Sequence, residues 1–192
     1  MARRLAKRLG QPAVLARATR LLVDANRSRR HPARFSEWSG RLPAPARPEL
    51  ERRLWWPHWQ QVARRLLAVD GPATHLAVHS FDSRLAPGRE RIDVGLLYDP
   101  SRPRERALAY ALADGLAREA PALRVRRNAP FRGVADGLPT AIRRRCADRL
   151  YAGCEVELGQ HVLAGRHYAA TRGRLLAGLW RGLEAQVGRA LG

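Results

Sequence analysis

Two places in the sequence put a histidine or an acid at the end of an apolar run, where a side chain could do chemistry. His79 follows the apolar residues 76–78, and Glu155 and Glu157 flank Val156, so both glutamates point to one face of a strand. A neutral imidazole can bind a metal or move a proton, and a carboxylate at a strand end can act as a general base. Two plainer interpretations stay open: a half-buried, hydrogen-bonded His79, and an edge strand whose glutamates face water.

Three further polar clusters lie at one end of apolar runs, namely Asp24/Asn26/Arg27, Arg91/Asp93 and Arg127/Asn128. In layered α/β folds, ligand sites form where strands end, so we take Arg91 and Asn128 as candidate substrate-binding residues. The loop 128–137 is punctuated by glycine and proline and is predicted to cover a substrate. The arginine run 143–145 is predicted to be the solvated face of a helix.

Two other features are predicted to be structural. His75 lies four positions before His79, which on a strand means about 13 Å at roughly 3.3 Å per residue, too far to share a metal ion. Trp55, Trp56 and Trp59 cluster on one predicted helix and are expected to pack in the core rather than to stack on nucleic-acid bases.

The spacing of apolar residues predicts the elements that must position these groups. The expected strands cover residues 19–24, 74–81, 92–99, 123–128 and 151–158. The expected helices cover residues 2–9, 48–69, 102–119, 140–149 and 167–191. Strands separated by long helices predict an α/β fold, in which helices cover a sheet on both faces. With 192 residues, 45% of them hydrophobic, the chain is expected to form a single domain, residues 1–192.

The charge of the chain says little about its partners. The formal net charge is +19, but only Lys7 of the 36 basic residues is a lysine, and the arginines run along the whole length. This indicates a biased composition more than a nucleic-acid surface, so nucleic acid is not the expected partner, although nonspecific binding stays an alternative. No segment is apolar enough for a membrane span or a signal peptide, and Cys146 and Cys154 lack metal-site spacing. We therefore expect a cytoplasmic protein with reduced thiols and no membrane partner, and the oligomeric state is left open.

Five sequence blocks occur together in an order that resembles one enzyme family. The blocks are TRLLVDANRSRRHPARFSE, VHSF, RIDVGLLYDPSRPRERAL, LRVRRNAPFRGVADGLPTAIRRR and RLYAGCEVELGQ. They span about residues 15–161 and resemble the N-formylglutamate amidohydrolase family, within the wider zinc carboxypeptidase and aspartoacylase-like group. The resemblance implies a three-layer α/β sandwich with a mixed sheet flanked by helices, as in zinc carboxypeptidases. It also implies the metal-dependent hydrolysis of a small acidic N-acyl amino acid, N-formyl-L-glutamate, to formate and L-glutamate.

The resemblance further implies a zinc ion and a general base. His79 corresponds to one ligand of a zinc ion that would polarise the substrate carbonyl and activate water. Glu157, three residues before Gln160, corresponds to the general base, and Glu155 is the second choice.

Residues near the start of the chain correspond to the family's substrate-binding groups. Asn26 and Arg27 correspond to the pair that holds the substrate carboxylate, a role that suits the planar fork of an arginine and the amide donor of an asparagine. Arg20 corresponds to the arginine that stabilises the oxyanion of the tetrahedral intermediate.

One part of the family pattern has no counterpart in this sequence. In the family an upstream H-x-x-E pair supplies two further zinc ligands, and residues 1–19 contain no His, Asp or Glu. We therefore expect an N-terminally truncated chain with an incomplete zinc site. Two hypotheses follow: a shortened form of an active zinc hydrolase, or a non-catalytic member that binds an acidic small molecule through Asn26 and Arg27.

Overall fold

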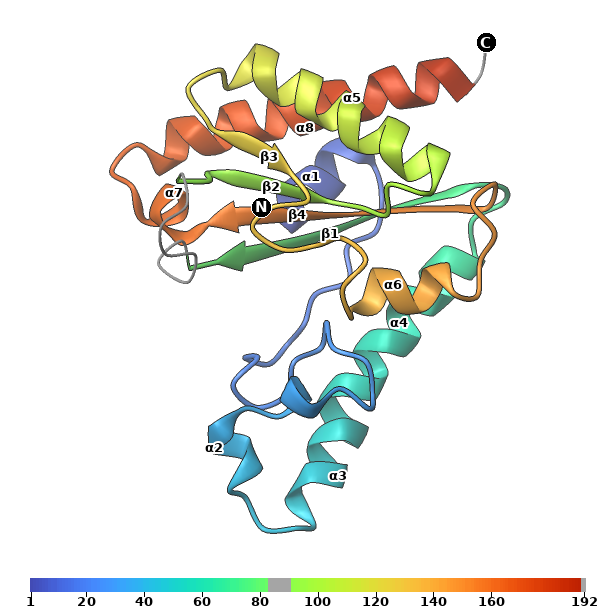
Figure 1. Cartoon of the computed structure of the whole chain (residues 1–192), viewed down its shortest axis with the longest axis vertical. Coiled ribbons are helices and arrows are strands. Elements are labelled where there is room, and N and C mark those ends of the chain that lie inside the picture. The colour runs from blue at the N-terminus through green and yellow to red at the C-terminus, as the bar shows by residue number, and fades with distance from the viewer. Residues whose placement is uncertain (83–90, 191–192) are drawn as a thin grey trace.

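The computed structural model describes residues 1–82 and 91–190, in which four strands form one open mixed sheet (Figure 1). The strands are β1 (Ala73–Phe81), β2 (Val94–Leu97), β3 (Val125–Arg127) and β4 (Tyr151–Gly159), in the spatial order β1-β4-β2-β3. β1 runs parallel to β4 and β2 parallel to β3, whereas β2 and β4 are antiparallel. These elements confirm the predicted α/β class and four of the five predicted strands.

Four of the five predicted helices lie close to their predicted positions, whereas the helix predicted over 140–149 is shorter, because it ends at Arg143 and turns follow. The α-helices are α1 (Ala2–Leu9), α2 (Glu37–Gly40), α3 (Ala46–Leu50), α4 (Trp56–Leu67), α5 (Pro103–Glu119), α6 (Leu138–Arg143), α7 (Gln160–Ala164) and α8 (Tyr168–Ala190). Two other helical turns are η1 (Pro32–Arg34) and η2 (Glu51–Trp55), and η2 joins α3 to α4 as a π-helical turn. The helix expected over 48–69 is therefore a chain of three segments, and α8 confirms the helix expected over 167–191, whose last residue lies outside the described residues.

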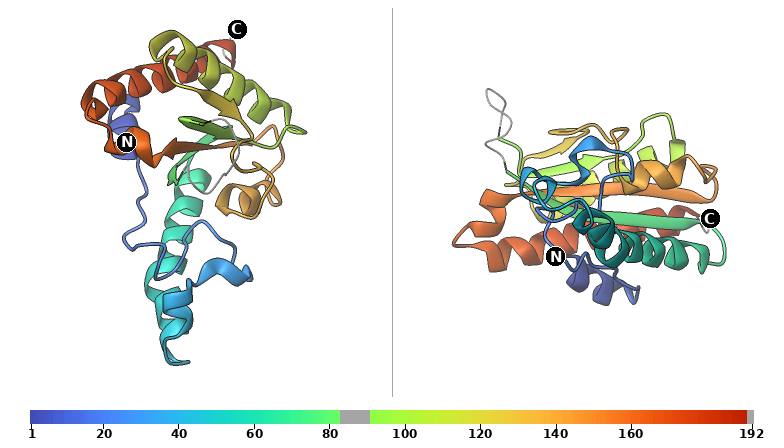
Figure 2. Two further views of the ribbon diagram at one scale, coloured as in Figure 1. Left: turned by 60° about the vertical axis from the view of Figure 1, so that its left-hand side comes forward. Right: turned by 90° about the horizontal axis from the view of Figure 1, so that it is seen from below.

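One face of the sheet is apolar and forms the core. Cys154, Val156 and Leu158 of β4 point to this face and are almost completely buried. They pack against leucines of α5 and α8, the two helices that cover this face in Figure 1. The alternate residues of β4, among them Glu155 and Glu157, therefore face the other side, where α4 and α6 lie (Figures 1 and 2).

The strand predicted over residues 19–24 is wrong. This segment forms turns instead, and it lies in a lobe with α2 and α3 that projects away from the sheet (Figures 1 and 2). The Leu22 amide bonds the Thr19 carbonyl, and the side chains of Leu21 and Leu22 are exposed, whereas Val23 is buried. The apolar run indicated burial, but a strand also needs a neighbouring strand to pair its backbone groups, and here the Leu22 and Asp24 amides bond Thr19 and Arg34, neither of which lies in a strand.

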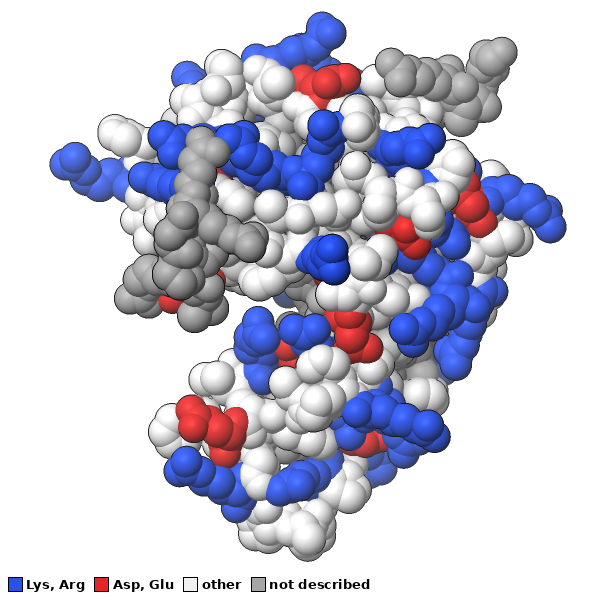
Figure 3. Space-filling view, viewed as in Figure 1, with Lys and Arg blue, Asp and Glu red and all other residues white. Residues whose placement is uncertain are grey.

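The basic residues are spread over the molecule. On the face shown in Figure 3, Lys and Arg lie over both the sheet region and the projecting lobe, with acidic side chains between them. Among the described residues no helix is long and apolar enough to cross a membrane.

Candidate active site

The parallel pairing of β1 and β4 brings their carboxyl ends together on the polar face of the sheet. His79 and Glu157 are partners in the register of the two strands, and Glu155 lies two residues earlier on β4. The sequence places His79 and Glu157 78 residues apart, and only this pairing makes them neighbours. Side chains that are adjacent in register on one face lie within reach of each other.

Glu155 is tied to its surroundings by a histidine and an amide. His79 Nε2 lies 3.4 Å from Glu155 Oε2, and Asn26 Nδ2 donates a hydrogen bond of 2.9 Å to the same oxygen. Burial acts to raise the pKa of Glu155, but the contact with His79 and the Asn26 bond outweigh burial and lower it. Burial likewise acts to lower the pKa of His79, yet Glu155, Glu157 and Asp24 raise it. Each side chain of this pair therefore favours the charged form of the other.

Glu157 is buried and incompletely bonded. Glu157 is 7% exposed. Its Oε2 has no hydrogen-bond partner of suitable geometry among the described residues, and the same holds for His79 Nε2. Burial raises the pKa of Glu157, and the charge of Glu155 adds to this, whereas His79 and Arg20 oppose it. A buried carboxylate with a raised pKa and an unused oxygen suits proton transfer.

A turn holds Asn26 against Glu155. The Asn26 amide N–H bonds Asp24 Oδ1 at 3.0 Å, and Asn26 Oδ1 accepts the Leu138 amide at 3.1 Å. Asp24 also pairs with Arg20, whose Nη2 lies 3.0 Å from Asp24 Oδ2. Asn26 therefore connects β4 with the start of α6.

Arg27 and Ser28 continue this turn toward the loop 128–137. Arg27 Nη1 donates to the Asp136 carbonyl at 3.0 Å, and the Ser28 amide donates to Asp136 Oδ2 at 2.9 Å. The substrate-binding roles of Asn26 and Arg27 stay predictions, but both residues lie where two chain segments meet beside Glu155.

Of the three tryptophans predicted to pack in the core, Trp55 is buried and Trp59 half-buried, whereas the prediction is wrong for Trp56, which is exposed. Trp55 and Trp59 also have a polar role. Trp55 Nε1 donates to the Arg27 carbonyl at 2.9 Å, and Trp59 Nε1 donates to the Ala25 carbonyl at 2.8 Å. A buried indole N–H needs an acceptor, so the two rings fix the backbone on either side of Asn26. Sequence reasoning missed this role because the acceptors lie about 30 residues away.

The other two predicted substrate-binding residues, Arg91 and Asn128, have polar partners of their own. Arg91 is exposed, and its Nε lies 3.3 Å from Asp93 Oδ1, an oxygen that also lies 2.6 Å from His161 Nε2. Asn128 Oδ1 accepts the amides of Tyr98 and Gly133, both at 3.1 Å, so this oxygen fixes the loop 128–137. Whether either residue also binds substrate stays a prediction.

The loop 128–137 reaches the site because of a glycine. In register, Gly95 of β2 is the partner of Glu157, and the Ala129 carbonyl packs on the position that a Cβ of Gly95 would occupy. A side chain there would also contact the Glu157 Cβ. The loop predicted to cover a substrate thus packs on the sheet directly beside Glu157.

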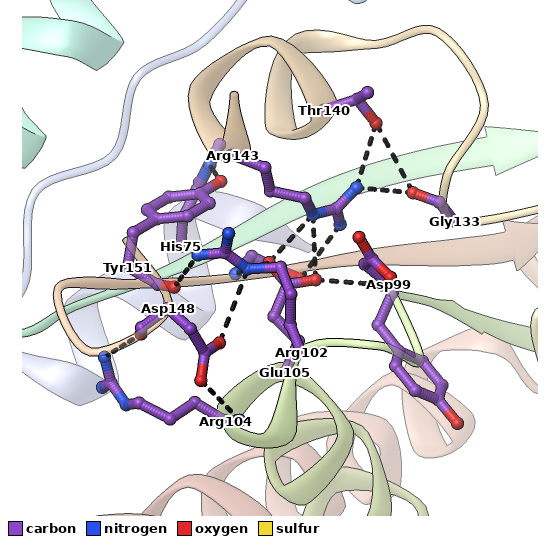
Figure 4. A network of polar contacts seen from close by, with 12 residues as sticks. His75, Asp99, Arg102, Arg104, Glu105, Gly133, Thr140, Arg143, Asp148 and Tyr151 are labelled. Carbon is purple, nitrogen blue, oxygen red and sulfur yellow. Dashed lines mark hydrogen bonds and ion pairs between the residues drawn. The ribbon is translucent and has the colours of Figure 1, made fainter. Parts of the chain in front are cut away.

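Two buried residues, Arg143 and His58, were misjudged or missed. Arg143 was predicted to be solvated with its neighbours, and this is wrong: it is 8% exposed and bonded to Glu105, whereas Arg144 and Arg145 are exposed (Figure 4). His58 of α4 has a buried Nδ1 with no hydrogen-bond partner among the described residues. Burial lowers the pKa of His58, and the charge of His79 lowers it further.

His75 has the character predicted for it. Its Nδ1 lies 2.9 Å from the Tyr151 hydroxyl, and burial lowers its pKa to about 4, so the ring is neutral near pH 7 (Figure 4). His75 therefore serves as a hydrogen-bonded structural residue on the same face of β1 as His79.

Comparison with known proteins identifies the family of this sequence. A sequence model of the family described as N-formylglutamate amidohydrolase matches residues 1–164. This range includes the first 14 residues, which lie outside the five sequence blocks. No curated protein matches the sequence.

Two crystal structures share the fold. One is a gene product of Agrobacterium tumefaciens, 24% identical, with a TM-score of 0.66 over 86% of this chain and 68% of the other. The second is an N-formylglutamate amidohydrolase from Ralstonia eutropha, 16% identical, with a TM-score of 0.70 over 88% of this chain and 74% of the other. At these identities the two structures show the fold, and the sequence match shows the family. This chain belongs to the N-formylglutamate amidohydrolase family.

Proposed function

We propose that this protein hydrolyses N-formyl-L-glutamate to formate and L-glutamate, with Glu157 as the general base. The family match supports an amide hydrolase that acts on a small N-acyl amino acid. The observation that carries the proposal is the buried Glu157 carboxylate, whose Oε2 has no hydrogen-bond partner among the described residues and whose strand position is paired with that of His79. Buried polar atoms are almost always hydrogen-bonded in native proteins, so an unbonded carboxylate oxygen favours a ligand over a structural role.

In the proposed reaction, the Glu157 carboxylate takes a proton from a water molecule as the water oxygen adds to the formyl carbon. The carbonyl electron pair moves to the formyl oxygen, which becomes an oxyanion. Glu157 then gives its proton to the amide nitrogen, the carbon–nitrogen bond breaks, and glutamate leaves with a neutral amine. Formic acid loses its proton to solvent, and Glu157 is again ionised. A general base of this kind contributes typically about 10²–10⁴-fold to a rate.

Two cationic groups are available to the oxyanion. His79 lies beside Glu157 with a raised pKa, and Arg20 is near enough to act on the pKa of Glu157. Arg20 is largely exposed and is held by Asp24 at 3.0 Å, so its guanidinium can leave Asp24 at little cost. We assign the stabilisation of the oxyanion to Arg20 and the orientation of Glu155 to His79.

The substrate carboxylates need cations at the rim of the site. Arg27 is partly exposed and uses Nη1 for the Asp136 carbonyl, and Arg91 is exposed at the edge of the sheet where β4 ends. A guanidinium has five N–H donors, so either residue has donors left for a carboxylate.

The zinc ion implied by the family was tested against the residues present. His79 Nε2 makes no hydrogen bond of suitable geometry and lies 3.4 Å from Glu155 Oε2, so as a neutral imidazole it would fit one ligand position. A catalytic zinc site takes three protein ligands, and residues 1–82 and 91–190 contain no group of three His, Cys, Asp or Glu side chains that could hold a metal. These residues alone therefore do not fit a complete zinc site, and no step above passes through a metal.

That mismatch favours a second candidate function, the binding of an acidic small molecule without turnover. Asn26, Arg27 and Arg20 would hold the ligand, and Glu157 would remain a buried acid. Both candidates use the same site and differ only in whether the amide bond is cleaved.

The experiment that separates them measures formate and binding on the same purified protein. N-formyl-L-glutamate is supplied with and without added zinc, formate is followed with a coupled formate dehydrogenase assay, and affinity is measured by calorimetry. N-formyl-L-leucine, which lacks the side-chain carboxylate, is the matched control ligand. Formate release that is selective for N-formyl-L-glutamate supports hydrolysis, and selective binding without formate supports the second candidate. The absence of both results contradicts both.

A further inference from the structure

A second buried carboxylate, Glu105 of α5, lies under the loop 128–137 and is completely bonded (Figure 4). It is 0% exposed and accepts Arg143 Nε on both oxygens, at 2.8 and 2.9 Å. The Gly153 amide donates to Oε1 at 3.1 Å, and the Asp99 amide donates to Oε2 at 2.9 Å. Glu105 thus joins α5 to β4 and to the segment that follows β2.

Arg143 carries this connection from Glu105 to the loop. Its Nη1 donates to the Gly133 carbonyl at 2.5 Å and to Thr140 Oγ1 at 2.9 Å. Its Nη2 donates to the Gly153 carbonyl at 3.3 Å, so Glu105 and Arg143 bond both backbone groups of one residue. Gly153 lies two residues before Glu155 on the same face of β4.

The same loop contacts the turn that carries Asn26. Asp136 receives bonds from Arg27 Nη1 and the Ser28 amide, and the Leu138 amide bonds Asn26 Oδ1. Thr140 Oγ1 donates to the Ala135 carbonyl at 2.7 Å. The segment 133–138 is therefore held by Arg143 on one side, and it holds Asn26 on the other.

We propose that Glu105 and Arg143 form a positioning pair for the substrate-binding turn. Through Gly133 and Thr140, Arg143 fixes the segment 133–138, which places Asn26 against Glu155. Through Gly153, the pair fixes the position of the β4 backbone that carries Glu155. The inference has a structural part, the ordering of the turn, and a kinetic part, its effect on KM. Only the kinetic part rests on the proposed function.

A merely structural role and a positioning role predict different behaviour of an apolar pair. Replacing a buried ion pair by packed apolar side chains often leaves stability unchanged, because both charges leave together. Arg102, whose Nε also lies 3.3 Å from Glu105 Oε1, keeps Asp148 as a partner at 3.5 Å. In the double variant Glu105→Met/Arg143→Met the fold is then preserved, but the bonds to the Gly133 carbonyl and to Gly153 are lost. A structural role predicts normal behaviour of the turn in this variant, and a positioning role predicts a loosened turn.

Amide hydrogen exchange measured by NMR tests the structural part. In the double variant, the Leu138 and Ser28 amides are expected to exchange at least ~10-fold faster, while the Val156 amide in the core of the sheet is unchanged. The matched control is Arg144→Met, the exposed neighbour, for which no change is expected. Unchanged exchange of Leu138 and Ser28 in a folded double variant overturns the inference.

Thr140→Val decides the matter if the double variant does not fold. This nearly isosteric change removes only the hydroxyl that Arg143 and the Ala135 carbonyl share, and leaves Glu105 in place. Faster exchange of Leu138 is expected here too, and an unchanged rate overturns the inference.

The kinetic part is read as a split between KM and kcat for N-formyl-L-glutamate. The double variant is expected to raise KM about 10-fold with kcat within about 3-fold, because the turn binds the substrate and Glu157 remains in place. If KM is unchanged although the amides exchange faster, the pair orders the turn without affecting substrate binding, and the kinetic part is overturned. If the unaltered protein releases no formate, the proposed function fails while hydrogen exchange still decides the structural part.

Discussion

Glu105 and Glu157 are both buried carboxylates that contact the sheet, and they differ in how completely they are bonded. Glu105 is 0% exposed and its two oxygens receive a guanidinium and two backbone amides. Glu157 is 7% exposed, keeps an oxygen without a partner among the described residues, and has a raised pKa. Burial alone therefore does not distinguish a structural acid from a reactive one. The difference lies in the number of hydrogen bonds that compensate for the loss of water.

The largest expected effect comes from removing one half of the satisfied pair. Glu105→Met leaves Arg143 charged, buried and unpaired, which should lower the free energy of unfolding by about 3–5 kcal/mol. Denaturant unfolding followed by circular dichroism measures this loss. Glu49→Gln, which removes an acid from a largely exposed ion pair with Arg52, is the control and should change the stability far less. Equal losses in the two variants would show that the buried network contributes no more to the free energy of unfolding than an exposed ion pair.

A somewhat smaller loss is expected where the loop 128–137 meets the sheet. Gly95→Ala places a Cβ on the Ala129 carbonyl and should cost about 1–3 kcal/mol through the shift of the loop. The control is Gly173→Ala in α8, where a Cβ meets nothing within 4 Å and alanine should stabilise the helix by up to about 1 kcal/mol. The same substitution thus has opposite signs at the two positions, and thermal unfolding of both variants checks it. A stable Gly95→Ala variant would mean that the loop does not pack against β2.

Removing the charge of the unsatisfied acid should stabilise the protein. Because its folded-state pKa is raised, ionised Glu157 costs stability, and this cost appears as the pH rises through that pKa. Glu157→Gln should therefore raise stability at pH 7 by about 1 kcal/mol, or ~2–4 °C in Tm, with no gain at acid pH.

Glu155→Gln is the matched control, two residues earlier on the same face of β4. The pKa of Glu155 is lowered, so its charge stabilises the fold, and this contribution disappears as the pH falls through the lowered pKa. The variant should melt at a lower temperature than the unaltered protein at pH 7. Two melting curves that shift in the same direction would contradict the contrast between these glutamates.

The smallest expected effect is a change in the titration of His79. Glu155 helps to hold the pKa of His79 above its ordinary value, whereas burial acts to lower it. In Glu155→Gln the pKa of His79 should fall, as measured by NMR titration of the imidazole C–H protons. The spectrum of His79→Gln identifies the His79 signal. An unchanged titration would place the two side chains further apart than the 3.4 Å found between them.

Much of the fold could be predicted from the sequence because the core segments have clear periodicity. β4 alternates apolar and polar residues, and α5 carries leucines at helical spacing, so their types and positions follow from pattern alone. The segment 19–24 failed because its apolar run shows that something is buried but not whether a strand partner exists. Only Val23 of its three apolar side chains is buried.

The candidate site was predictable in part. His79 and Glu157 were identified from polar residues at strand ends, and the resemblance connected them, but their register could not be derived without strand order. The network around Arg143 could not be predicted, because a buried arginine and its two exposed neighbours look alike in the run Arg143–Arg145. Glu105 gave no signal either, since an acid in the first turn of a helix is usually a solvated, dipole-stabilising residue.

Formate release from N-formyl-L-glutamate by the Glu157→Gln variant, compared with the unaltered protein, tests the central claim most directly. If Glu157 is the general base, the amide preserves the shape of the side chain, the fold melts at a higher temperature, and the rate falls about 10²–10⁴-fold. A folded Glu157→Gln protein that releases formate at the original rate would contradict the assignment of Glu157 as the reactive acid.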